Sequence, residues 1–226
     1  MLTPRRQSLK TLGIALASIG FARSTAAAPN ESLSSSGSHT LDAFTTRLAA
    51  LPRRRNFRSV PMILDRRDES DADALDAVLH YTGSHKQSWD NTDISGPWLN
   101  VMRNSMNAEI WLFRHPDFLC VSATHGTAQL ALYDDAMWDK YGLAKIAGRN
   151  VTRNSFVVPS PASEQDPKDF QNPNGAYSSK ANSIQTLQRR GVVFLACHNA
   201  VWELCERLIA ANANPDNLTN DTMCPK

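Results

Sequence analysis

Apolar residues recur every three or four positions in several stretches of the chain, a spacing that predicts amphipathic helices. The first such face follows Thr40, which can cap a helix, and begins with Leu41 and Phe44. The same spacing predicts helices over residues 40–51, 71–79, 97–106, 127–141, 179–190 and 200–208. Glycines at positions 142 and 191 are expected to end two of these helices. In the helix at 71–79, the residues expected to face inward are Ala74, Leu75, Val78 and Leu79.

Three other stretches have the composition of β-strands. Residues 117–124 are typical of a mostly buried strand. Residues 192–196 form a short, continuous apolar run, which is typical of a strand at the centre of a parallel sheet. Residues 57–64 are also strand-like, but Pro61 restricts them to an edge or a broken strand. Because strands alternate with helices, the sequence predicts a single α/β domain with a small, mostly parallel sheet flanked by helices.

Two stretches show no hydrophobic period. Residues 29–39 are expected to be a polar linker with nothing to bury, which places the folded domain at residues 40–226. Residues 144–177, called the excursion below, are polar and rich in Asn and Pro. A loop of that length in a small domain is either a functional element or poorly ordered.

Residues 1–28 have the parts of an export signal. A charged start containing Arg5 and Arg6 precedes a mildly apolar segment at 11–21, and small residues follow. The adjacent arginines resemble a twin-arginine leader, so we expect the twin-arginine export machinery as a partner and the periplasm as the location. The alternative is an ordinary secretory signal with two chance arginines. The apolar segment is shorter than the ~20 residues of a membrane span, so we expect no span after cleavage.

The excess of basic over acidic residues in the whole chain comes from this leader. The whole sequence has 24 Lys and Arg residues against 22 Asp and Glu, but residues 1–28 contain four of the bases and no acid. The mature chain is therefore slightly acidic, and its charge gives no case for nucleic-acid binding. Cys-x-x-Cys pairs, zinc-ligand spacings and dinucleotide or phosphate-loop motifs are absent from the sequence, so no metal or cofactor is predicted.

Residues capable of chemistry directly follow the two buried strands. His125 and Gly126 come after the strand at 117–124, and Cys197, His198 and Asn199 come after the strand at 192–196. Ligands of open α/β sheets bind outside the carboxyl ends of the strands, so we expect these residues to border one crevice. A thiolate is a nucleophile, and both a helix N-terminus and a nearby imidazolium favour this anion. Cys197 and His125 are therefore the candidate catalytic residues. The alternative is a small buried cysteine with a packing role.

The residues near Cys197 also have structural interpretations that involve no ligand. His125 either pairs with the thiol or hydrogen-bonds the turn at Gly126. His198 either contacts a ligand or faces solvent, and Asn199 either contacts a ligand or caps the last helix. Cys120 is expected in the core, and the pairing of the four cysteines is left open.

Residues 121–126 with 132–141, and residues 187–199, resemble the DsrE/DsrF-like group of small α/β proteins. In that group a strand ending in His-Gly leads into a helix, and Leu-Gln-x-x-Gly-Val-x-Phe leads to a cysteine at a strand end. The resemblance implies a parallel sheet between helices that is often part of a homo-oligomer. Some members relay sulfur on a cysteine, which would correspond to Cys197, and many have no known activity. The chain departs from the group in the excursion and in lacking a final strand, so either the sheet is one element short or the sequence is truncated.

Three functions are compatible with these observations. The first is an exported DsrE-like protein that binds a small ligand or relays sulfur through Cys197, with His125 beside it and ligand contacts from Gly126, His198 and Asn199. The second is a non-catalytic interaction or scaffold module whose contact surface is the excursion. The third is a metal-binding accessory protein that uses His125, Cys197 and His198. Whether the protein is an enzyme is left open.

Overall fold

The computed structural model describes residues 32–53, 58–148 and 151–223. The predicted leader, with Arg5 and Arg6, lies outside the described residues, and so does Cys224. The strands are β1 (Lys86–Asn91), β2 (Leu119–Thr124) and β3 (Val193–Ala196). The α-helices are α1 (His39–Ala50), α2 (Ala72–Leu79), α3 (Trp98–Asn107), α4 (Asp135–Tyr141), α5 (Ala144–Ala147), α6 (Ile184–Arg189), α7 (His198–Ala210) and α8 (Asn220–Met223). Short 3₁₀ or π turns cover Arg67–Glu69, Ala108–Leu112, Ala128–Leu132 and Pro161–Glu164.

The three strands form one parallel sheet in the order β1–β2–β3, which confirms the predicted α/β class. β2 is central and almost fully buried, and this explains why most of its residues are apolar. β3 is an edge strand, so the prediction that it lies at the centre was wrong. Its apolar sequence reflects contacts on both faces of the sheet, because Phe194 packs into one core cluster while Val193 and Leu195 pack against the other.

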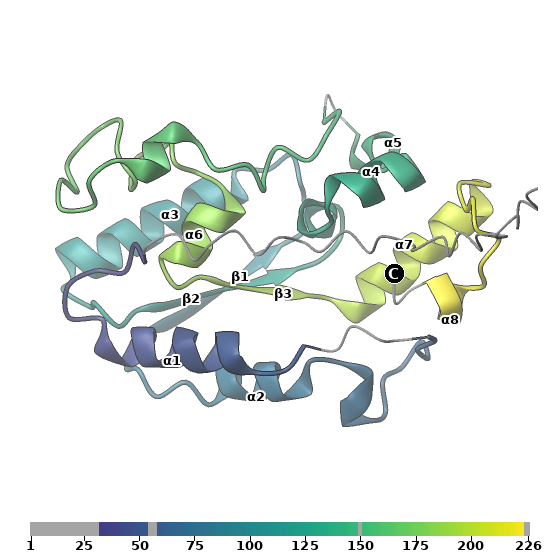
Figure 1. The fold of residues 1–226 in the computed structure, drawn as a ribbon, viewed down its shortest axis with the longest axis horizontal. Helices are drawn as coiled ribbons and strands as arrows, with labels where there is room; N and C mark the ends of the chain where they lie inside the picture. Colours follow the sequence, from purple (N-terminus) through teal and green to yellow (C-terminus); the bar gives the residue numbers. More distant parts are fainter. Residues whose placement is uncertain (1–31, 54–57, 149–150, 224–226) are drawn as a thin grey trace, which may run out of the picture. The chain divides into compact units, whose positions relative to one another are not determined.

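Helices cover both faces of the sheet, with α1 and α2 on one side and α3 and α6 on the other (Figure 1). Alternate residues of β2 point to the two sides. Leu119 and Val121 pack with Leu41 and Phe44 of α1, whereas Cys120 belongs to the larger cluster around Met102 of α3. The sheet and the helices on its two faces form a three-layer α/β/α arrangement, with one core cluster on each side of the sheet.

The first strand lies in a different part of the chain from the one predicted. Residues 58–64 contain no strand. The Val60 N–H donates to the Asp221 carbonyl at 3.0 Å, and Pro61 has no N–H to offer a sheet. β1 is instead formed by the nearly all-polar sequence Lys-Gln-Ser-Trp-Asp-Asn, which alternates between exposed and partly buried positions. An edge strand with one solvated side does not need an apolar run.

Two predicted helices have different boundaries in the structure. The helix expected at 127–141 is divided into the 3₁₀ turn Ala128–Leu132 and α4, because the Asp134 carboxylate caps α4 by accepting the Met137 N–H at 2.8 Å. Gly142 ends α4 with a φ of +59°, as predicted. The helix expected from residue 179 begins only at residue 184, after its cap Ser183.

Two expectations about burial were also wrong. In α2, the buried residues are Ala74, Ala77 and Val78, whereas Leu75 and Leu79 are exposed. Residues 32–38 do bury a side chain, since Leu33 is only 3% exposed and packs with Ala176 and Tyr177. The described part of the predicted linker is therefore packed against the domain.

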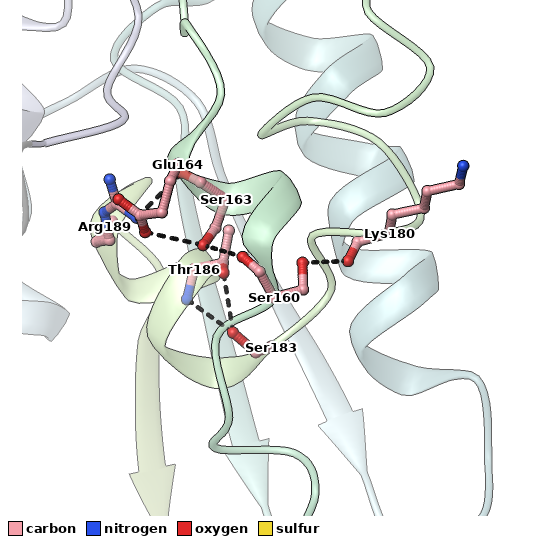
Figure 2. A network of polar contacts seen from close by, with 7 residues as sticks. All are labelled: Ser160, Ser163, Glu164, Lys180, Ser183, Thr186 and Arg189. Carbon is pink, nitrogen blue, oxygen red and sulfur yellow. Dashed lines mark hydrogen bonds and ion pairs between the residues drawn. The ribbon is translucent and has the colours of Figure 1, made fainter.

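The excursion is attached to the region around α6 by the polar network in Figure 2. Ser160 Oγ donates to the Lys180 carbonyl, and Ser163 Oγ donates to the Ser160 carbonyl at 2.6 Å. Arg189 of α6 forms an ion pair with Glu164 at 2.8 Å. These contacts hold the excursion on the side of the sheet that α3 and α6 cover.

Candidate functional site

The candidate residues lie at the carboxyl edge of the sheet, as the sequence predicts for residues that follow parallel strands. Thr124 of β2 is paired with Ala196 of β3, so His125 and Cys197 are the next residues along two neighbouring strands. Adjacent strands lie about 4.8 Å apart. The fold therefore brings the backbones of the two residues together, although they are 72 positions apart in the sequence.

Cys197 is the N-cap residue of α7, a helix of 13 residues. Its backbone N–H donates to the Thr124 carbonyl at 3.1 Å and to Gln129 Oε1 at 3.2 Å. Its side chain makes no capping hydrogen bond and is partly exposed. Both backbone contacts fix the Cα position, so the thiol projects from a rigid point beside the positive end of a helix dipole.

The other two described cysteines are buried, and none of the three is joined to another by a disulfide. Cys120 lies in the middle of β2, where burial raises the pKa of its thiol to about 12. Cys205 is buried on the inward-facing side of α7. Of the cysteines in the described part of the chain, Cys197 is the one that a dissolved reagent can reach.

His125 forms a pair with a carboxylate that the sequence analysis missed. Its Nε2 lies 2.5 Å from Asp90 Oδ1 on β1, and the side chains of His125 and Asp90 are 40% and 76% exposed. The carboxylate holds the imidazole toward β1, which lies on the opposite side of β2 from the strand that leads to Cys197. Asp90 was missed because it belongs to the strand that the polar sequence did not reveal.

Gly126 is required by the backbone geometry of the turn after β2. Its φ is +55°, and a Cβ at this position would lie 2.5 Å from the Thr92 carbonyl oxygen. That carbonyl accepts the Thr127 N–H at 2.9 Å. A turn with positive φ and a close backbone approach explains the glycine without a ligand contact.

The two residues after Cys197 have different surroundings. His198 Nε2 lies 2.9 Å from the Pro61 carbonyl oxygen and so ties α7 to the segment that was predicted to be a strand. Asn199 is exposed in the first turn of α7. It is not the cap of this helix, as one alternative proposed, because Cys197 occupies that position.

Two cavities border this region. The first holds about 30 Å³ and is lined by Gly126 and Gln129 together with residues of α7, but by neither His125 nor Cys197. That volume suits a water molecule more than a substrate. The second is a groove of about 410 Å³ that runs along β3 as far as Ala196, with α2 as its other wall. The groove therefore ends one residue before Cys197.

No cluster of three or more His, Cys, Asp or Glu side chains that could hold a metal ion occurs in the described residues. The helices within the same residues are all too short or too polar to cross a membrane. Comparisons of the chain with protein-family models, curated proteins and solved structures found no match. The resemblance to the DsrE/DsrF-like group and the role of Cys197 therefore stay predictions.

Proposed function

We propose that the protein is an exported sulfur-relay protein of the DsrE-like type that carries sulfur on Cys197. The observation that carries this proposal is the difference in exposure between the cysteines. Cys197 is partly exposed at a strand end and helix N-terminus, while Cys120 and Cys205 are buried. A carrier thiol must meet a donor and then an acceptor, so it must be both accessible and fixed in place.

The proposed loading step needs no external oxidant. The Cys197 thiolate attacks the outer sulfur of a polysulfide or another sulfane-sulfur donor. A sulfur–sulfur bond forms on Cys197, and the donor's own sulfur–sulfur bond breaks, releasing the shortened donor as a thiolate or sulfide. Relay is the same exchange in reverse, in which an acceptor thiolate takes the outer sulfur and Cys197 returns to its thiolate form.

Intact-mass measurement of the purified protein after exposure to polysulfide tests the proposal. The wild type should gain about 32 Da, the mass of one sulfur atom, as a persulfide. Cys197→Ala should gain nothing, and Cys205→Ala, a matched change within the same helix, should behave like the wild type. A wild type without the adduct, or an equal adduct on Cys197→Ala, would remove Cys197 as the carrier. The interaction module would then be favoured, since Phe170 of the excursion lies exposed on Trp111, which is followed by the exposed Leu112 and Phe113.

Export to the periplasm is part of the same proposal and rests on the arginines at positions 5 and 6. Replacing both with lysine keeps the charge of the leader but removes the feature that the twin-arginine machinery reads. Fractionation of cells should then find the protein retained in the cytoplasm. Undiminished export of this double variant would indicate the ordinary secretory route.

A further inference from the structure

Two arginines are buried between the sheet and the helices on one of its faces. Arg103 of α3 is 6% exposed, and Arg190, which directly follows α6, is 1% exposed. They lie close to each other because Asn107, one helical turn after Arg103, accepts a hydrogen bond from Arg190 Nη2 at 2.8 Å. Arginine is almost never fully buried unless it is paired with an acceptor.

Most of the hydrogen-bond donors of the two guanidinium groups find no acceptor in residues 32–53, 58–148 and 151–223. Arg103 Nη2 donates to the neighbouring Asn104 Oδ1 at 2.6 Å, and Arg190 uses only Nη2. The Nε and Nη1 atoms of both residues are buried and have no hydrogen-bond partner within the described residues. An unpaired buried donor is costly, and an unpaired buried charge is more so.

Among the described residues, no carboxylate compensates the two charges. Burial lowers the pKa of Arg103, and it lowers the pKa of Arg190 to about 10. The charge of Arg103 further lowers the pKa of Arg190. In the part of the chain that the structure describes, the groups that oppose these effects are Tyr177 and Cys120, both uncharged at neutral pH. The pair is thus a concentrated positive charge in a medium of low polarity.

Two aromatic side chains cover Arg190. The Arg190 guanidinium carbon lies 4.9 Å from the ring centre of Tyr177 and 5.5 Å from that of Trp111. Tyr177 is held in place at both ends, since its hydroxyl donates to the Leu33 carbonyl at 3.2 Å and its own carbonyl accepts from Asn107 Nδ2 at 3.1 Å. This cover keeps water away from the Arg190 guanidinium and strengthens its attraction for an anion.

We propose that Arg103 and Arg190 together bind a small oxyanion, such as sulfate, phosphate or a carboxylate. The planar guanidinium fork matches two oxygens of such an ion, and the ion would supply acceptors for the donors that the protein leaves unused. Tetrahedral and carboxylate oxyanions share this chemistry, and titration with each one distinguishes them. The site is separate from Cys197 and does not depend on the sulfur-relay proposal.

Calorimetric titration of the purified protein with sulfate, phosphate and acetate, at an ionic strength kept constant with sodium chloride, tests the proposal. The wild type should bind at least one of these anions saturably at a single site. Arg103→Met should weaken that binding about tenfold or more, because a charge-assisted contact is lost. Arg47→Met, which removes an exposed arginine of α1, should bind like the wild type.

Thermal unfolding separates loss of binding from loss of folding. In a buffer that contains chloride alone, Arg103→Met should unfold at or above the temperature of the wild type, since an unpaired buried charge has been replaced by an apolar chain of similar length. Added sulfate or phosphate should then raise the unfolding temperature of the wild type more than that of Arg103→Met. Absence of saturable binding to the wild type, or equal binding to Arg103→Met, would overturn the proposal.

Discussion

Replacement of Gly126 by alanine tests the geometry of the candidate site most sharply. The φ of +55° costs alanine about 1–2 kcal/mol. A Cβ would also lie 2.5 Å from the Thr92 carbonyl oxygen, which is held by the N–H groups of Thr127 and Ala128, and such overpacking costs about 1–3 kcal/mol. We therefore expect Gly126→Ala to lower the free energy of unfolding by about 2–5 kcal/mol.

Gly142 provides a matched control for this prediction. Its φ is +59°, but nothing lies within 4 Å of the position that a Cβ would take. Gly142→Ala should therefore lose only the conformational part, about 1–2 kcal/mol. Urea unfolding followed by circular dichroism measures both variants, and each kcal/mol should lower the thermal midpoint by about 2–4 °C. Equal losses in the two variants would refute the close approach to Thr92, and Gly126 would then need another explanation, such as contact with a ligand.

Three further predictions concern other parts of the domain. Asn154 is buried, and its amide donates to the carbonyls of Ala131 and Tyr133. In urea titrations, Asn154→Ala should therefore lower the free energy of unfolding by about 2–4 kcal/mol. An unchanged free energy would contradict this anchoring of the excursion. Asp134→Ala should cost about 1 kcal/mol in the same titration through loss of the α4 cap, whereas an unchanged free energy of unfolding would show that the cap contributes nothing. Burial raises the pKa of the Cys120 thiol to about 12, so the thiol stays protonated at neutral pH. Iodoacetamide should therefore modify Cys120 only after the protein unfolds. Peptide mass spectrometry that found Cys120 alkylated in the native protein would refute this prediction.

The parts of the fold that the sequence predicted are those where burial determines the residue type. β2 is covered on both sides, and four of its six residues are apolar. β1 was missed because an edge strand with a solvated side tolerates lysine, glutamine and aspartate. Residues 57–64 were taken for a strand on composition alone, although Pro61 already weakened that interpretation.

The sequence predicted which residues lie at the candidate site, but not the residues that contact them. The rule that ligands bind at strand ends located His125 and Cys197, and the register of β2 and β3 places them at neighbouring positions. The partners of both residues come from elsewhere in the fold. Asp90 lies on the missed strand, and Gln129, whose side chain accepts the Cys197 N–H, lies in a turn that was predicted to be helix. A sequence pattern gives no direct information about such contacts.

The burial of the two arginines could not be predicted from the sequence. Arg190 stands at the end of a predicted helix, where a basic residue is ordinarily solvated and interacts with the helix dipole. Only the packing of α6 against α3, together with the cover formed by Tyr177, removes Arg190 from water. Periodicity cannot distinguish a charge on a solvated turn from one that another segment covers.

The central claim is that sulfur is carried by Cys197 and by no other cysteine of the chain. The most direct measurement exposes the wild-type protein, with all four cysteines present, to one equivalent of polysulfide and then locates the added sulfur by peptide mass spectrometry. We predict that the gain of about 32 Da lies on the peptide that contains Cys197. Sulfur found on the Cys224 peptide, or spread evenly over all the cysteine peptides, would contradict the account.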